Sequence, residues 1–204
     1  MARPNDRKPE ETRRLLLEVA IDQFARYGLH GASSRELAKA AGVTVAIVNY
    51  HFRSKEGLYD AAVDEVYRRL RERIGAGLQL GHPIHLDDLL GRIYRAARRE
   101  RDGVRLLLRQ VLDTGRLTER TIAAHFLPQI EEASATAARL LAVHPRQART
   151  AMVAVSFLMT RYLIQDDRSL AIAFGVGSAK QAETLVIETL TETAQALLHK
   201  EKRR

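Results

Sequence analysis

The 204-residue sequence contains no cysteine. This absence excludes disulfide bonds and thiolate metal sites, and it gives no indication of a redox compartment. Long apolar runs are also missing, because the best one, residues 151–160, has about half of the ~20 residues that a membrane-spanning helix needs. The N-terminus carries charges where a secretory signal would have an apolar core. We therefore expect a soluble, cytoplasmic protein without a membrane segment.

The sequence also lacks a recognisable catalytic constellation. It has no cysteine nucleophile and no serine in a G-x-S-x-G sequence. Residues 175–180, GVGSAK, resemble a phosphate-binding loop, but they lack the G-x-x-x-x-G-K-[ST] spacing and follow no strand. His82 and His85 lie in a proline-containing loop where we do not expect a metal ion. We predict that the protein is not an enzyme and uses no cofactor.

No segment alternates with the period of two that an exposed strand requires, whereas apolar residues recur at helical spacing throughout. With 46% hydrophobic residues, the chain can bury a substantial core. Pro128 interrupts one long pattern, which predicts either two helices or one kinked helix there. We predict an all-α fold of about nine helices, with short helices inside residues 33–55 and longer ones over residues 10–27, 55–78, 86–101, 103–113, 118–142, 146–165 and 178–200.

Residues 33–55 have the pattern of two short helices joined by a tight turn. Ser33 can cap the first helix, and Glu36 three residues later completes a capping box. Gly42 follows this helix, where a left-handed residue is needed and glycine takes it without strain. Thr44 offers a hydroxyl to cap a second helix over residues 45–51.

The second helix of this pair has an unusual outward face. Val48 and Phe52 are four residues apart and can point together into a core. The residues then left outward are Val45, Ala46 and Asn49. An outward Val-Ala pair suits thymine methyl groups, and Asn49 can form two hydrogen bonds with adenine. This is the pattern of a helix-turn-helix, in which the second helix enters the DNA major groove.

Three segments, RELAKAAGV, NYHF and SKEGLY, carry a specific resemblance. They resemble the DNA-binding domain of the TetR/AcrR family of bacterial regulators, over roughly the first quarter of the chain. The resemblance implies a three-helix DNA-binding domain over residues 1–55, with the helix-turn-helix at about 33–52. It implies a helical ligand-binding and dimerisation domain over residues 56–204. The family often carries a tyrosine where this chain has Asn49, so the operator sequence does not transfer from a relative.

The predicted DNA contacts come from the start of the first short helix, from the second helix, and from a lysine beside a helix N-terminus that suits a phosphate. They are Ser33, Ser34, Arg35, Thr44, Val45, Ala46, Asn49, Tyr50, His51 and Lys55. Half of the net charge of +8 lies in residues 1–55, which hold 10 Lys and Arg against 6 Asp and Glu. Residues 1–9 are either a frayed terminus or a basic arm that reaches DNA through Arg3, Arg7 and Lys8.

Two helical patterns near the C-terminus indicate a partner subunit. Residues 151–159 are apolar on nearly every side and need cover on every side. A homodimer with a four-helix interface about a two-fold axis would supply it, and it would bind an inverted-repeat operator. The alternative is a monomer with a deeply buried helix. The predicted interface residues are Val155, Met159, Ala182, Leu185, Val186, Thr189, Thr193 and Leu197.

Polar groups within largely apolar helices predict a pocket for a small-molecule effector. The candidates are Tyr94, Arg98, Arg109, Gln110, His125 and Tyr162. A solvated arginine face and a core histidine are the alternatives for several of them. We predict a sequence-specific transcriptional regulator, a repressor released by its effector. The open alternatives are an effector-independent architectural DNA-binding protein, which would need few base-reading residues, and a helical enzyme that kept a DNA-binding domain.

Overall fold

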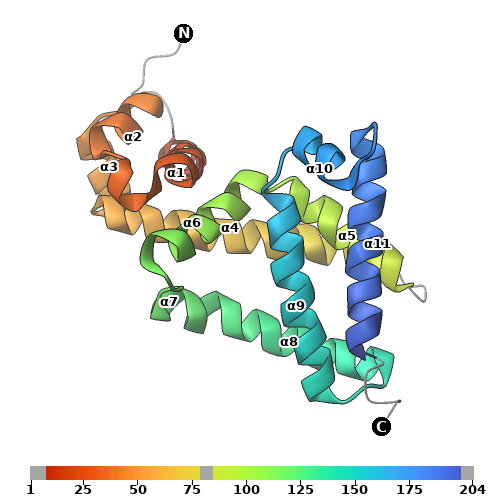
Figure 1. The fold of residues 1–204 in the computed structure, drawn as a ribbon. Helices are drawn as coiled ribbons and strands as arrows, with labels where there is room; N and C mark the ends of the chain where they lie inside the picture. Colours follow the sequence, from red (N-terminus) through yellow and green to blue (C-terminus); the bar gives the residue numbers. More distant parts are fainter. Residues whose placement is uncertain (1–7, 79–84, 199–204) are drawn as a thin grey trace. The chain divides into compact units, whose positions relative to one another are not determined.

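The computed structural model describes residues 8–78 and 85–198, and within these ranges it contains helices and no strand (Figure 1). The all-α prediction is therefore confirmed. The basic arm predicted at Arg3 and Arg7, and the loop histidine His82, lie outside the described residues. The elements are α1 (Pro9–Gly31), α2 (Ser34–Ala40), α3 (Val45–Phe52), α4 (Lys55–Leu78), α5 (Leu86–Arg98), α6 (Arg101–Thr114), α7 (Glu119–Thr121), the π-helix η1 (Ile122–Phe126), α8 (Leu127–Leu141), α9 (Pro145–Leu163), α10 (Asp167–Phe174) and α11 (Ala179–Leu198).

The chain packs as two compact units that are not contiguous in sequence. The first contains the chain up to Arg71 together with Glu100–Leu117, and the second contains Glu72–Arg99 and the chain from Thr118 onward. Most of α4 and all of α6 thus pack with the helix-turn-helix. The functional division that the sequence suggested at residue 55 stays a prediction, and the packing boundary lies elsewhere.

The core of the first unit joins helices that are far apart in sequence. Phe24 of α1 and Leu58 of α4 are fully buried in it, as is Leu106 of α6. The ring of Phe24 meets that of Tyr59 edge to face, with centroids 5.0 Å apart. Burying one such side chain contributes about 1.5–3 kcal/mol, so the pairing of α1 with α6 is a main source of this unit's stability.

One glycine of the first unit allows α1 to approach α6 closely. Gly28 has φ 70° and ψ 176° inside α1, a conformation that is essentially restricted to glycine. A Cβ atom at this position would overlap the carboxylate of Asp113 on α6. The sequence predicted a helix over residues 10–27, and the regular helix does break at Gly28, after which the chain makes one further turn to Gly31.

In the second unit, α9 lies beside α11 and also contacts α5 and α8 (Figure 1). Its buried positions include Ala151, Val155 and Met159. Val186 and Leu190 of α11 are fully buried. The chain's own helices therefore cover much of the α9 surface that the sequence assigned partly to a partner.

The helical pattern around Pro128 continues through a wide turn instead of breaking. Proline lacks the N–H that would bond the carbonyl four residues earlier. The turn before it is the π-helix η1, in which the N–H of Leu127 donates to the carbonyl of Ile122, five residues back. A single π turn inside a longer helix accommodates such a lost bond.

Residues 167–174, which the sequence left in a loop, form the short helix α10. Asp166 caps it by accepting a hydrogen bond from the N–H of Ser169 at 2.8 Å, and Gly175 ends it with φ 67°. No single helix among the described residues is long and apolar enough to cross a membrane. The pair α10 and α11 reaches that length and apolarity only together, with a bend of 68° between them.

Candidate nucleic-acid interface

The first helix of the helix-turn-helix begins with the predicted capping box. The N–H of Glu36 donates to Ser33 Oγ, and the Ser33 N–H donates to Glu36 Oε2, each at 3.2 Å. The Ser33 hydroxyl also donates to that carboxylate at 2.7 Å, and these bonds lower the pKa of Glu36 below its ordinary value. Gly42 follows the C-terminal end of α2 and has φ 65°, the left-handed conformation that the sequence predicted there. The local sequence thus determines where α2 starts and stops.

The second helix, α3, is anchored and presented as the sequence predicted. Val48 and Phe52 are buried, at 0% and 7% exposure, while Ala46 and Asn49 are exposed. Tyr50 is 80% exposed. The anchoring residues therefore hold α3 in the core while its other side stays open to solvent.

Two residues at the start of α3 differ from expectation. Thr44 is at the N-cap position, but its side chain makes no cap hydrogen bond. The predicted cap is wrong, and the exposed Thr44 hydroxyl is not used by the helix. Val45 is half-buried and packs against the core, so only part of it faces outward.

All ten predicted DNA-contacting residues belong to the first unit, from Ser33 beside α2 to Lys55 at the start of α4. The exposed members are Ser33, Arg35, Thr44, Ala46, Asn49 and Tyr50, and the half-buried ones are Ser34, Val45, His51 and Lys55. Their roles toward DNA stay a prediction.

Lys55 has a structural partner that the sequence did not indicate. Its Nζ donates to the carbonyl of Ala32 at 3.1 Å and so ties the start of α4 to the end of α1. Ser54 caps α4, since the N–H of Gly57 donates to Ser54 Oγ at 3.1 Å. A Cβ atom at Gly57 would overlap the carbonyl of Phe52, so this glycine permits the tight connection between α3 and α4.

Sequence reasoning missed two arginines at the C-terminal end of α3. The guanidinium of Arg13, from α1, lies over the ring of Phe52, with its Cζ 5.4 Å from the ring centroid. Arg53 directly follows Phe52 and has φ 67°, which is uncommon for a residue with a side chain. The Arg13–Phe52 contact joins residues 39 positions apart and therefore leaves no local signal in the sequence.

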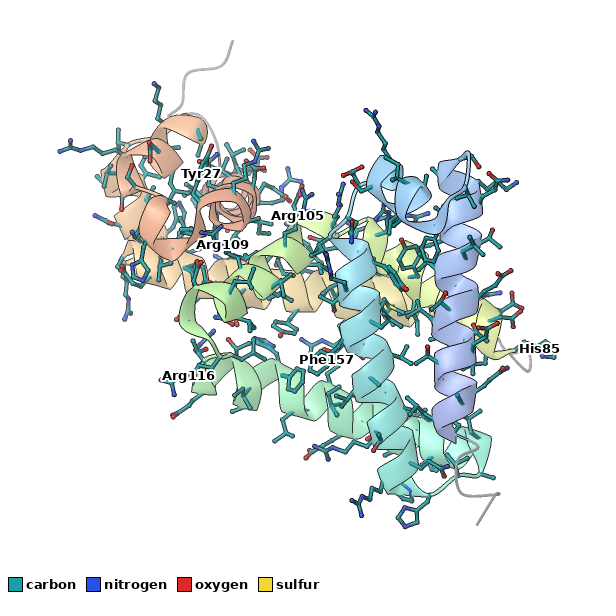
Figure 2. All side chains as sticks on the ribbon, in the orientation of Figure 1. Tyr27, His85, Arg105, Arg109, Arg116 and Phe157 are labelled. Carbon is teal, nitrogen blue, oxygen red and sulfur yellow. The ribbon has the colours of Figure 1, made fainter. Side chains whose placement is uncertain are left out.

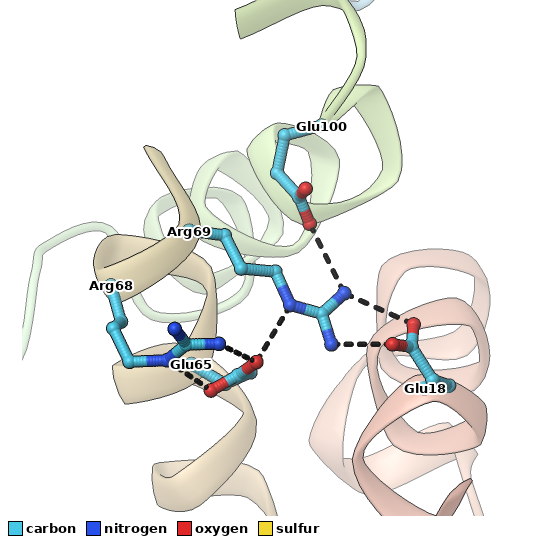
Figure 3. Close-up of polar contacts among 5 residues, drawn as sticks. All are labelled: Glu18, Glu65, Arg68, Arg69 and Glu100. Atoms are coloured by element: carbon cyan, nitrogen blue, oxygen red, sulfur yellow. Dashed lines mark hydrogen bonds and ion pairs between the residues drawn. The ribbon is translucent and has the colours of Figure 1, made fainter. Parts of the chain in front are cut away.

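An ion cluster joins α1, α4 and the start of α6 behind this surface (Figure 3). Arg69 donates to both carboxylate oxygens of Glu18, at 3.0 and 2.6 Å, and to Glu65 at 2.7 Å. Its Nη1 is 3.5 Å from the carboxylate of Glu100. Hydrogen bonds from Arg68, together with Arg69, lower the pKa of Glu65 to about 2 although burial opposes this shift. Burial alone would lower the pKa of Arg69, but its bonds to Glu18 and Glu65 raise it.

The predicted effector residues are divided between the two units. Arg109, which is labelled in Figure 2, and Gln110 belong to the first unit. Arg109 Nε pairs with Asp113 at 2.7 Å. Gln110 is 3% exposed. The other candidates, in the second unit, are Tyr94, Arg98, His125 and Tyr162.

Arg98 has a structural role that its arginine-rich surroundings concealed. Its guanidinium donates to the carbonyls of Leu163, at 3.4 Å, and Gln165, at 2.9 Å, and it pairs with Asp167. It also lies 6.0 Å from the ring centre of the buried Tyr94. Arg98 thus supplies hydrogen bonds to carbonyls at the C-terminal end of α9 and an ion pair to the first residue of α10. Effector binding by these residues stays a prediction.

Four of the eight predicted interface residues are buried within the single chain. Val155 and Met159 are 7% exposed, Ala182 is 1% and Val186 is 0% exposed. The chain's own helices already cover these four side chains, and the interface role of all eight residues stays a prediction. The half-buried remainder are Leu185, Thr189, Thr193 and Leu197. Phe157 of α9, which the prediction left out, is 63% exposed (Figure 2).

The fold and the capped two-helix motif define a helix-turn-helix protein. The family model described as bacterial regulatory proteins, tetR family, matches residues 16–62, which include α2, α3 and the start of α4. The HTH-type transcriptional regulatory protein RaaS of Mycobacterium tuberculosis is 46% identical over 66 residues, which are 32% of this chain and 31% of that protein. The HTH-type transcriptional regulator AcrR of Shigella flexneri is 36% identical over 75 residues, 37% of this chain and 33% of that protein.

Solved structures are similar along most of the chain. A TetR-like transcriptional regulator from Rhodococcus sp. RHA1 has a TM-score of 0.65 at 16% identity and covers 91% of this chain and 94% of its own. A tetR-family regulator from Streptomyces coelicolor has a TM-score of 0.65 at 21% identity, covering 95% and 85%. These structures share the fold, whereas the matches to curated relatives span about a third of each relative. Residues 16–62 thus match the tetR family model, and the chain shares the fold of TetR-family regulators along most of its length.

Proposed function

We propose that this protein is a transcriptional regulator that reads an operator with α3. The observation that carries the proposal is the presentation of this helix. Val48 and Phe52 hold it in the core, while Ala46, Asn49 and Tyr50 remain exposed on it. Asn49 can bond both polar atoms of an adenine edge, and Ala46 can contact a thymine methyl group. The relatives named as HTH-type transcriptional regulators support the same function.

The proposed mode of action is repression that a small-molecule effector relieves. Occupancy of a promoter is enough for repression, so no further activity is required of the chain. The support for effector control is α4, which begins at Lys55 in the first unit and continues past Arg71 into the second. A continuous helix can transmit a small movement from one end to the other. A coupling of about 1–3 kcal/mol would change operator affinity 5- to 150-fold.

We propose a homodimer as the DNA-binding form. The exposed ring of Phe157 on α9 offers an apolar anchor, and α11 adds the half-buried stripe of Leu185, Thr189 and Thr193. A two-fold pair of chains presents two copies of α3. The operator is then an inverted repeat, with half-sites about one helical turn or somewhat more apart.

The test of base reading starts with an operator selected from random duplexes by the unaltered protein. Replacement of Asn49 by alanine is expected to cost about 1–3 kcal/mol on this operator and little on a scrambled duplex of equal length. The matched control, Gln195→Ala, removes an exposed amide from α11 and should change neither affinity. Equal losses on both duplexes for Asn49→Ala would remove this residue from base reading.

The same selection separates the regulator from an architectural DNA-binding protein. A protein that depends on phosphate contacts alone binds all duplexes with similar affinity. A selection that yields no shared inverted repeat, with equal affinity for every duplex, would therefore favour the architectural function. A shared inverted repeat would support the regulator.

A further inference from the structure

At the C-terminal end of α3, one guanidinium group lies over a buried ring and a second arginine follows that ring in the chain. Arg13 lies over the face of Phe52, and Arg53 follows Phe52 in the chain. Both arginines are exposed. Within residues 8–78 and 85–198, neither guanidinium takes part in an ion pair or a side-chain hydrogen bond. These two positive charges therefore have no neutralising carboxylate in the described part of the protein.

Arg13 is held in place by its contact with Phe52. The ring is only 7% exposed and is fixed in the core of the first unit. A guanidinium within about 6 Å of an aromatic centroid is attracted to the ring face. A cation–π contact forms no hydrogen bond, so the N–H groups of Arg13 stay available as donors. Arg13 is thus positioned beside α3 although it belongs to α1.

Arg53 occupies a backbone conformation that disfavours its own side chain. Its φ and ψ are 67° and −42°, and its N–H donates to the carbonyl of Asn49 at 2.8 Å to close α3. Glycine adopts a positive φ without strain. Arginine at this position is therefore explained by its side chain and not by the turn, and sparsely populated backbone conformations are concentrated at functional sites.

We infer that Arg13 and Arg53 bind the DNA backbone beside the C-terminal end of α3. The inference rests on the proposed function, which gives α3 the major groove. A guanidinium suits phosphate because its N–H groups can form two parallel hydrogen bonds with one phosphate group. Lys55, the phosphate contact expected from the sequence, already donates to the carbonyl of Ala32. The two arginines supply positive charge at this end of α3 that has no partner within the described chain.

The experiment compares Arg13→Gln and Arg53→Gly with the unaltered chain, on operator and scrambled duplexes, from 0.1 to 1 M salt. Each phosphate contact contributes about 0.9 to the slope of log affinity against log salt. Each variant should therefore lose about 0.9 of slope, and on both duplexes it should bind on the order of eightfold more weakly at 0.1 M salt, with the difference vanishing near 1 M. Arg149→Gln, which removes an exposed arginine from α9, is the control with the same change of charge and should keep the full slope.

The Arg53→Gly variant separates a DNA contact from a structural role. Since glycine relieves the positive φ, this variant should melt at a higher temperature while it binds DNA more weakly. A lower melting temperature together with weaker binding would assign Arg53 to the turn and overturn its role. An unchanged slope for either variant, measured where the unaltered protein binds its operator, would remove that arginine from the interface. Failure of the unaltered protein to select any duplex would instead contradict the proposed function.

Discussion

The ion cluster around Arg69 offers a sharp test of how the first unit is held together. Replacing Arg69 with methionine keeps an unbranched apolar stem at this position but removes the guanidinium and its charge. In the structure this side chain is only 15% exposed and bonds Glu18 of α1 and Glu65 of α4. Its carboxylate neighbours differ in environment, since Glu18 is 54% exposed and Glu100 is 6% exposed.

The expected cost follows from these exposures. Removing one partner of a fully buried ion pair costs about 3–5 kcal/mol, because the other charge stays buried. Glu18 can return to water, and Glu65 keeps its bonds to Arg68, at 2.8 and 2.6 Å. We therefore expect Arg69→Met to lower the free energy of unfolding by about 2–4 kcal/mol at pH 7. Urea unfolding followed by circular dichroism measures it.

The matched control is Arg26→Met on α1. Arg26 pairs with Asp22 at 2.7 Å, but their side chains are 64% and 37% exposed. Exposed pairs of this kind are worth about 0.2–1 kcal/mol. A loss of less than about 0.5 kcal/mol for Arg69→Met, no larger than that of the control, would refute the reasoning that burial makes this cluster stabilising.

The cluster also predicts a dependence on pH. The pKa of Glu65 is depressed from 4.5 to about 2 in the folded protein. A carboxyl with a depressed pKa stabilises the fold above its ordinary pKa, and this contribution is lost as the pH falls through the folded value. The difference between the unaltered protein and Arg69→Met should therefore shrink as the pH is lowered from about 4.5 toward 2. A constant difference across this range would show that the carboxylates are not its source.

Two further predictions concern packing and assembly. Gly28→Ala should lower the free energy of unfolding by about 2–4 kcal/mol, because φ at this position is positive and the new methyl group overlaps the Asp113 carboxylate of α6. The control is Gly75→Ala, whose new methyl group meets nothing within 4 Å and should leave stability unchanged or raise it by about 0.5–1 kcal/mol. Urea titrations compare the two variants. Phe157→Glu should convert the proposed dimer to monomers in sedimentation experiments and weaken operator binding, while Ile172→Glu, at a residue 70% exposed on α10, should not. A Phe157→Glu variant that sediments as a dimer would place the interface elsewhere.

Local sequence signals predicted most of the helix-turn-helix, because caps and turns depend on neighbouring residues. Ser33 and Gly42 act as their spacing indicated. Asp166 and Gly175 bracket α10 and are a signal for it, but no helix is predicted from the sequence over these eight residues. Short helices carry too few turns for periodicity to stand out.

Contacts between distant residues were beyond the reach of such signals. The bond from Arg69 to Glu18 joins residues 51 positions apart and depends on how α1 and α4 pack. Periodicity identified the apolar stripes of α9 and α11, but it does not say which neighbour covers a stripe. The structure shows that Val186 of α11 is buried by the chain's own helices, at 0% exposure, while Phe157 of α9 is exposed.

The discontinuous first unit has a consequence for attempts to exchange DNA-reading modules between regulators. A graft cut at residue 55, where the motif ends, would leave α6 behind. The graft would also lack nearly all of α4, so Phe24 would lose its edge-to-face contact with Tyr59 and α1 would lose the helix α6 that it packs on. A transplantable module must carry α6 as well as α1 to α4, although the whole of α5 lies between them in the chain. New operator specificity is therefore better introduced by substituting the exposed positions of α3 than by swapping the segment that contains it.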